Sequence, residues 1–172
     1  MNHLKNVGLA FRIYATDNND LFPGQGLGAD GFDATSLKAV DIFRALSNEL
    51  STPKIVICPT DSLAREATNW SDFDAESLSY FASLSASESK PNMFLAGDRF
   101  LLNDGKPIGA SIILLSNAPA NLSWSGQRDG HGRNGYNIAM ADGTVDDFSS
   151  SELAPAIRKQ GAATNHLAMP GF

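Results

Sequence analysis

The chain has 172 residues, and 42% of them are hydrophobic, which suits one domain with an ordinary packed core. It carries 13 Lys and Arg residues against 19 Asp and Glu residues, and the net charge of -6 would repel a phosphate backbone, so nucleic acid is not an expected partner. The one cysteine, Cys58, cannot form an intramolecular disulfide or a Cys-based metal site, and we expect it to be a small buried side chain. The longest apolar run, Ile112 to Leu115, is far shorter than the roughly 20 residues that cross a bilayer.

Two helices are predicted before any strand. Leu4, Val7, Phe11 and Tyr14 recur at spacings of three and four, with Ala10 and Ile13 widening the stripe. This pattern predicts an amphipathic helix over residues 2–16 that stops at Asp17-Asn18-Asn19-Asp20. After a loop around Pro23-Gly24, a second helix is predicted to begin near Thr35 or Ser36. Its apolar stripe consists of Leu37, Val40, Phe43, Leu46 and Leu50.

Short strands are predicted in the rest of the chain. The segments with β-type patterns are residues 54–58, 78–84, 93–96 and 111–115. The clearest hairpin is Tyr136 to Phe148, where Asp142-Gly143 predicts a two-residue type I′ turn. That register places Met140 opposite Val145, and it also sets Asp147 opposite Ile138, a conflict that a bulge would relieve.

The C-terminal region is predicted to form one more helix and a tail. Ser149 and Glu152 have the spacing of a capping box, so a helix is expected from there to Gln160, with residues 161–172 loosely held. The order of elements favours a single α+β domain over residues 1–172. In chain order, the second helix lies between the first helix and an antiparallel sheet.

Most patterns that could carry catalysis have a simpler structural explanation. His3, His131 and His166 lie far apart without helical i, i+4 partners, so a histidine metal site is not expected. The glycines from Gly126 to Gly135 do not open a helix, which favours a loop over a phosphate cradle. Ser123 and Ser125 lack the glycine spacing of a nucleophile elbow.

Carboxylates near turns leave a calcium site open as an alternative. Asp142, Asp146 and Asp147 could supply oxygen ligands to calcium, but Asp-Gly also makes hairpin turns unaided, and turn formation is the preferred interpretation. The same two readings apply to Asp17 to Asp20, so no metal ligand is assigned.

Two further clusters each allow a structural and a functional interpretation. Asp98 and Arg99 could be the acid and base of an active site, but an ion pair with another loop is favoured because no polar cluster joins them in sequence. Trp70, Phe73 and Trp124 could line a ligand groove, although aromatic side chains more often close the edge of a small core.

Several segments, in order along the chain, resemble pilin-like proteins that carry a prepilin-type cleavage and methylation signal. Residues 2–14 are similar to the part of the long N-terminal helix that follows its membrane half, and Asp17 to Pro23 to the polar break after it. Cys58-Pro59-Thr60-Asp61, Ser79-Tyr80 and Gly97-Asp98-Arg99 resemble three further motifs of that family.

The most specific likeness is His131 to Val145. It resembles the C-terminal processing-associated signature, which is a histidine, nine residues and then Asp-Gly. Here ten residues separate His131 from Asp142, and Thr144 replaces the usual second histidine. These departures put in doubt any role that depends on the exact position of the histidine.

The resemblance implies a pilin-like fold and a function in assembly. Residues 1–16 would be the remnant of a stalk helix preceded by a leader and an apolar membrane helix, and the domain would lie in the periplasm or at the cell surface. Its partners would be other pilin-like subunits and secretion components of a type II secretion pseudopilus or type IV pilus-like filament. No catalytic residue and no cofactor are assigned, so the chain is not expected to be an enzyme. The alternative is a membrane-anchored surface domain that binds a glycan or polymer through Trp70 and Trp124.

Overall fold

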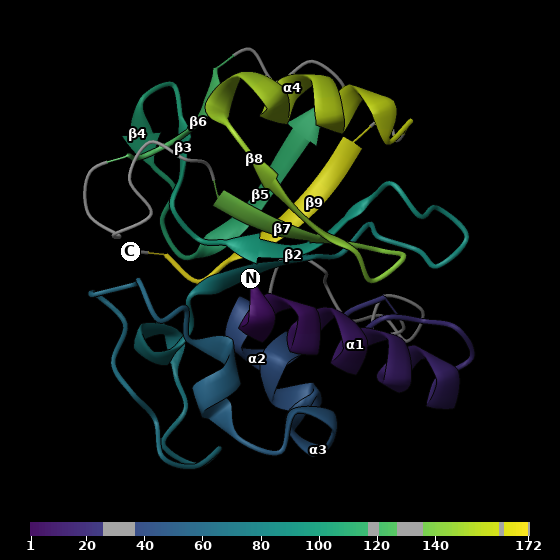
Figure 1. The fold of residues 1–172 in the computed structure, drawn as a ribbon, viewed down its shortest axis with the longest axis vertical. Coiled ribbons are helices and arrows are strands. Elements are labelled where there is room, and N and C mark those ends of the chain that lie inside the picture. The colour runs from purple at the N-terminus through teal and green to yellow at the C-terminus, as the bar shows by residue number, and fades with distance from the viewer. Residues whose placement is uncertain (26–36, 117–120, 127–135, 162–163, 172) are drawn as a thin grey trace.

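A six-stranded antiparallel sheet separates two layers of the fold (Figure 1). The computed structural model describes residues 1–25, 37–116, 121–126, 136–161 and 164–171. In spatial order the strands of this sheet are β5 (Ser111–Ser116), β9 (Thr164–Met169), β1 (Tyr80–Ser83), β2 (Phe94–Asp98), β7 (Tyr136–Met140) and β8 (Val145–Phe148). The α+β class and the antiparallel sheet expected from the sequence are confirmed.

Helix α1 (Asn2–Asp17) packs on one face of the sheet, against β2 and β7. Leu4, Val7, Ala10 and Phe11 of the predicted stripe are buried and Tyr14 is half-buried, but the expectation that Ile13 widens the stripe is wrong, since Ile13 is 44% exposed. At Gly8 the helix faces the sheet, and a Cβ placed there would make ordinary contact with the Cβ of Ala139 at 3.6 Å. The N-terminal helix predicted over residues 2–16 is therefore confirmed, together with its break after Asp17.

The second predicted helix is split into two short ones. Helix α2 spans Ala39–Ala45 and α3 spans Ser47–Leu50, and Leu46 between them leaves helical geometry with ψ of 10°. The expected strand over residues 54–58 is wrong, because Pro53–Val56 forms the 3-10 helix η3. Pro53 is suited to a first helical turn, and the Thr52 side chain accepts a hydrogen bond from the Lys54 N–H there.

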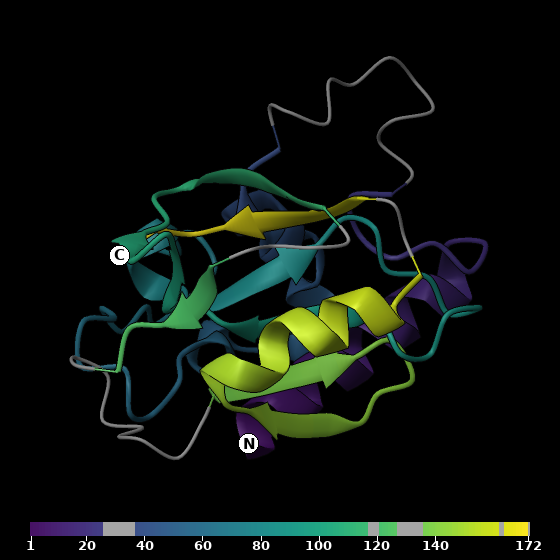
Figure 2. The same cartoon turned by 90° about the horizontal axis from the view of Figure 1, so that it is seen from above.

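The opposite face of the sheet is covered by helix α4 and a small second sheet (Figures 1 and 2). Helix α4 spans Ser150–Lys159, and the Glu152 carboxylate accepts from the Ser149 N–H at 2.8 Å, as the predicted capping spacing requires. The small sheet has the order β4-β3-β6, with β3 at Leu101–Asn103, β4 at Lys106–Pro107 and β6 at Leu122–Trp124. A short 3-10 helix, η4, spans Ala75–Ser77 before β1.

The hairpin between β7 and β8 exists, but its predicted register is wrong by one residue. Val145 lies opposite Ala139, not Met140, and Asp147 lies opposite Asn137. The Gly143 N–H donates to the Met140 carbonyl at 2.9 Å and the Met140 N–H to the Thr144 carbonyl at 2.8 Å, so the loop has three residues. Gly143 takes a φ of +89°, which fits the left-handed bulge position of such a loop.

The expectation of a loosely held tail is wrong for residues 164–169. They form β9, which lies inside the large sheet and pairs with β5 on one side and β1 on the other. Leu167, Ala168 and Met169 are buried. Residues 164–169 are therefore an inner strand of the sheet, next to the edge strand β5.

Candidate functional site

Three segments that resemble family motifs meet at one end of β1 and β2. In the β1–β2 ladder Tyr80 lies opposite Asp98, and the Arg99 N–H continues the pairing by donating to the Ser79 carbonyl at 2.9 Å. The Ser79 N–H in turn donates to the Val56 carbonyl at 3.0 Å, which brings in the segment leading to Asp61. We call Asp61, Ser79 and Arg99 the buried ion-pair network.

The network is a charged pair enclosed by protein. The Arg99 Nε lies 2.9 Å from Asp61 Oδ2, and Nη2 donates to Oδ1 at 3.1 Å. Two nitrogens of the guanidinium therefore contact the two oxygens of the carboxylate. Asp61 is 5% exposed and Arg99 3% exposed. The structural interpretation of Arg99, an ion pair with another loop, is thus the one that the geometry supports.

The remaining hydrogen-bonding capacity of the Asp61 carboxylate is also used. The Ser79 hydroxyl donates to Oδ2 at 2.7 Å, and the Leu63 N–H donates to Oδ1 at 3.0 Å. Together with Arg99 Nη2, these groups give the carboxylate three hydrogen bonds, beside its close contact with Arg99 Nε.

Arg99 also holds the C-terminal end of the chain. Its Nη1 donates to the Leu78 carbonyl at 3.1 Å and to the Gly171 carbonyl at 3.4 Å, and its guanidinium carbon lies 5.4 Å from the centre of the Phe100 ring. One side chain thus connects the 58–61 loop, the start of β1 and the residues after β9.

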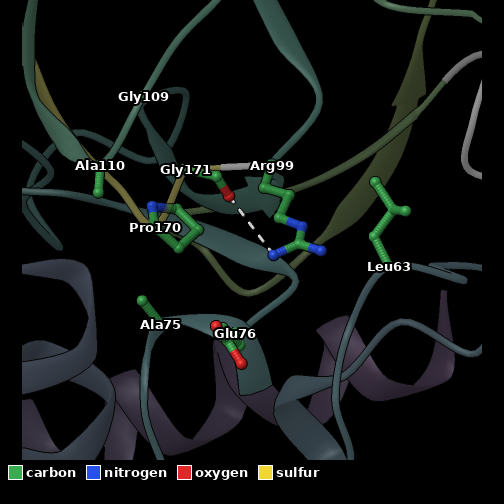
Figure 3. Close-up of a pocket in the computed structure, with 8 residues that line it drawn as sticks. All are labelled: Leu63, Ala75, Glu76, Arg99, Gly109, Ala110, Pro170 and Gly171. Carbon is green, nitrogen blue, oxygen red and sulfur yellow. Dashed lines mark hydrogen bonds between the residues drawn. The ribbon is translucent and has the colours of Figure 1, made fainter.

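A pocket of about 520 Å³ lies beside the network. Figure 3 shows the Arg99 guanidinium directed toward the Gly171 carbonyl, with Pro170 on one side of the pocket, Leu63 on the other and Glu76 facing it. The Arg99 donors are engaged with Asp61 and backbone carbonyls, so the guanidinium contributes to the wall of the pocket more than to anion binding.

The other polar motif residues near the network also have structural contacts. Asp98 Oδ2 accepts from the Asn137 N–H at 2.8 Å, and Cys58 Sγ lies 3.1 Å from the Thr60 hydroxyl oxygen. The pKa of the Tyr80 phenol is raised well above its usual range, mainly because the side chain is buried and secondly because Cys58 lies nearby. Tyr80 therefore stays protonated at physiological pH.

The carboxylates considered for calcium are separated by the hairpin. Asp142 Oδ1 accepts from the Thr144 hydroxyl at 2.7 Å and from its N–H at 2.9 Å, and these bonds lower the pKa of Asp142. Asp146 and Asp147 are neighbours on β8, so their side chains point to opposite faces of the sheet. Among the described residues, no group of three or more His, Cys, Asp and Glu side chains could hold a metal ion. Calcium binding stays an untested alternative to turn formation at these residues.

The other candidate ligands serve local contacts. His3 Nδ1 lies 2.8 Å from the Ile57 carbonyl oxygen, and His166 Nδ1 lies 3.0 Å from the Ser85 hydroxyl oxygen. In the segment Asp17 to Asp20, the Asn18 amide donates to the Tyr14 carbonyl at 2.8 Å, which closes the end of α1. His131 and the glycines from Gly130 to Gly135 lie outside the described residues.

The aromatic residues considered for a ligand groove are packed into the two cores. Trp124 is 7% exposed, stacks on Tyr136 with ring centres 4.5 Å apart, and donates its indole N–H to the Phe148 carbonyl at 2.8 Å. Phe73 is buried, and Trp70 is half-buried with its ring edge-on to Phe73. These rings do not form an exposed platform.

Sequence reasoning missed the role of Asp61 and Ser79. Both entered only as letters of short motifs, and neither was paired with Arg99. Asp61 and Arg99 are 38 positions apart in the sequence, so no local sequence pattern predicts that they form an ion pair. The only signal available was that Asp61, Ser79 and Arg99 each lie in a different family-like motif.

The chain was compared with protein-family models, curated proteins and solved structures, and none of them matches it. In the described part of the chain, no helix has both the length and the apolar character needed to cross a bilayer.

Proposed function

We propose that this chain is the ectodomain of a pilin-like assembly subunit, a component of a type II secretion pseudopilus or a type IV pilus-like filament. It acts by contact with other subunits, secretion components or secreted cargo, outside the cytoplasm, and a membrane helix before residue 2 anchors it. Its mechanism is assembly and not catalytic turnover.

The observation that carries the proposal is the apolar character of both sides of α1. One side is buried on the sheet through Val7 and Phe11, yet Leu9 on the outer side is 56% exposed and Ile13 is 44% exposed. Leu9 and Ile13 are four residues apart, so they lie together on the helix surface. A helix that presents apolar side chains away from its own core is suited to packing against a second protein.

The buried ion-pair network supports the same proposal. The motif residues Asp61, Ser79 and Arg99 are committed to one another, which gives them a role in maintaining the fold. The glycan-binding alternative relies on exposed rings at Trp70 and Trp124. Trp124 is buried and Trp70 is half-buried against Phe73, which favours the assembly proposal.

Site-specific crosslinking in cells tests the proposal. A photoreactive amino acid replaces Leu9 or Ile13 in the full-length protein, and exposed Lys106, on β4 beyond the opposite face of the sheet, serves as the control position. We expect crosslinks from positions 9 and 13 to a second copy or to a membrane-bound assembly protein, and none from position 106. Equal yields at all three positions, or none at 9 and 13, would contradict the assembly role.

The native gene offers an independent test. We expect the codons before Asn2 to encode a short basic leader followed by roughly 20 apolar residues. A gene that starts at Met1 would remove the anchored stalk from the proposal and favour a cytoplasmic binding protein.

A further inference from the structure

We propose that the free edge of β8 is a docking site for an extended, basic segment of a partner protein, which adds as a further strand to the large sheet. The proposal rests on the geometry of the sheet and does not depend on the proposed assembly function.

β8 is the terminal strand of the six-stranded sheet (Figure 2). Two observations show which β8 residues form hydrogen bonds with β7. In the hairpin the Met140 N–H donates to the Thr144 carbonyl, and the Asn137 N–H points away from β8 and donates to Asp98. Because bonded and non-bonded pairs alternate in an antiparallel ladder, Asp146 and Phe148 are the residues that bond to β7. Val145 and Asp147 therefore direct their backbone N–H and carbonyl groups outward, and an added strand can pair with them.

A groove of about 460 Å³ lies beside this edge, between α4 and the hairpin. Its lining consists of the apolar side chains of Met140, Phe148, Pro155 and Ala156 and the polar side chains of Asn92, Glu152 and Lys159. Residues that lie side by side on neighbouring strands face the same side of a sheet. Alternate side chains of an added strand would consequently point into this groove, which favours apolar residues at every second position.

The charge of the edge determines which strand it accepts. Asp146 and Asp147 are both exposed, one on each side of the sheet. If two copies of this chain paired through β8, these carboxylates would lie against one another, and like charges directly opposite are destabilising. Asp146 shares the groove face with Phe148, so Asp147 is the carboxylate on the other face, where it attracts Lys or Arg side chains of an added strand. The edge therefore disfavours self-association and favours a partner strand that alternates basic and apolar residues.

The test is a titration of the full chain with a synthetic peptide of alternating Lys and Val, followed by ¹⁵N-¹H NMR. We expect shift changes concentrated at Val145, Asp147 and the α4 residues that line the groove. A peptide of alternating Glu and Val serves as the probe of opposite charge, and it should cause no such changes. Binding of both peptides, or shifts spread over other acidic surfaces, would overturn the proposal.

Two kinds of variant separate backbone pairing from charge. Asp147→Pro removes an outward N–H that β7 does not use, so the fold should persist while peptide affinity falls about tenfold or more. Asp146→Asn with Asp147→Asn keeps the backbone and should weaken binding by about tenfold at low salt. Glu66→Gln removes an exposed carboxylate elsewhere, next to Lys54, and should leave affinity unchanged. Unaltered affinity in the Asn pair, or in a folded proline variant, would refute strand addition at this edge.

Discussion

Replacement of Arg99 by Met tests whether the buried ion-pair network holds this end of the fold together. Met fills much of the same space but leaves the Asp61 carboxylate, which is 5% exposed, without its counter-charge. Loss of one partner from a buried pair costs about 3–5 kcal/mol, because the other charge stays desolvated. The variant also loses the donors to the Leu78 and Gly171 carbonyls. Domains are typically stable by about 5–15 kcal/mol, so Arg99→Met should lose a large share of its free energy of unfolding.

Urea unfolding followed by circular dichroism measures the effect. Arg65→Met is the matched control, since Arg65 lies 2.6 Å from the Asp74 carboxylate but both side chains are about half exposed. That exposed pair should contribute no more than about 1 kcal/mol. The double variant Arg99→Met with Asp61→Asn removes both charges and should be more stable than Arg99→Met alone.

Two results would refute this reasoning. The first is a loss below about 1 kcal/mol for Arg99→Met, which would mean that water or rearrangement solvates Asp61. The second is a double variant whose loss equals the sum of the losses measured for Arg99→Met alone and for Asp61→Asn alone, which would show that the two charges do not interact.

Two further predictions concern the hairpin and α1. Thr144→Val removes the hydroxyl that is the main cause of the low pKa of Asp142, so that pKa should rise, while Thr144→Ser should preserve it; an NMR titration of the Asp142 carboxyl carbon measures both. A carboxyl group whose pKa is lower in the folded state than in the unfolded state stabilises the fold at pH values above its unfolded-state pKa. The wild-type protein loses this stabilisation as the pH falls through the folded-state pKa of Asp142, and Thr144→Val should lose less. Gly8→Ala should raise the free energy of unfolding by about 0.5–1 kcal/mol, since the helix gains propensity and the new Cβ makes ordinary contact with Ala139 at 3.6 Å; a destabilised variant in thermal unfolding would show that α1 cannot accept it.

The elements that could be predicted from the sequence are those specified by local patterns. Helix α1 follows from apolar residues at spacings of three and four, and α4 from Ser149 and Glu152. The hairpin follows from Asp142-Gly143, but its register does not, because the same dipeptide suits both a two-residue turn and a three-residue loop with a left-handed glycine.

The elements that were missed depend on contacts between distant residues. β9 begins with Thr164, Asn165 and His166, which carry little apolar signal, and it becomes a strand because β1 and β5 pair with it on both sides. In the 3-10 helix η3, Ile55 and Val56 suggested a strand, but Pro53 favours a helical turn at that point. The Asp61–Arg99 pair is of the same kind, since only the fold brings its partners together.

The buried ion-pair network and the exposed side of α1 differ in the role that their residues can have. Asp61, Ser79 and Arg99 are enclosed and bonded to one another, so substitutions there should change activity only through the stability of the fold. Leu9 and Ile13 on α1 have the opposite character, because they are apolar side chains exposed to solvent with no evident role in the core. A substitution such as Leu9→Ser should therefore leave the free energy of unfolding within about 0.5 kcal/mol and still weaken partner contact. If a Leu9→Ser variant that keeps its stability also keeps its yield of crosslinks at position 13, Leu9 does not contribute to partner recognition, and the apolar outer side of α1 does not determine it.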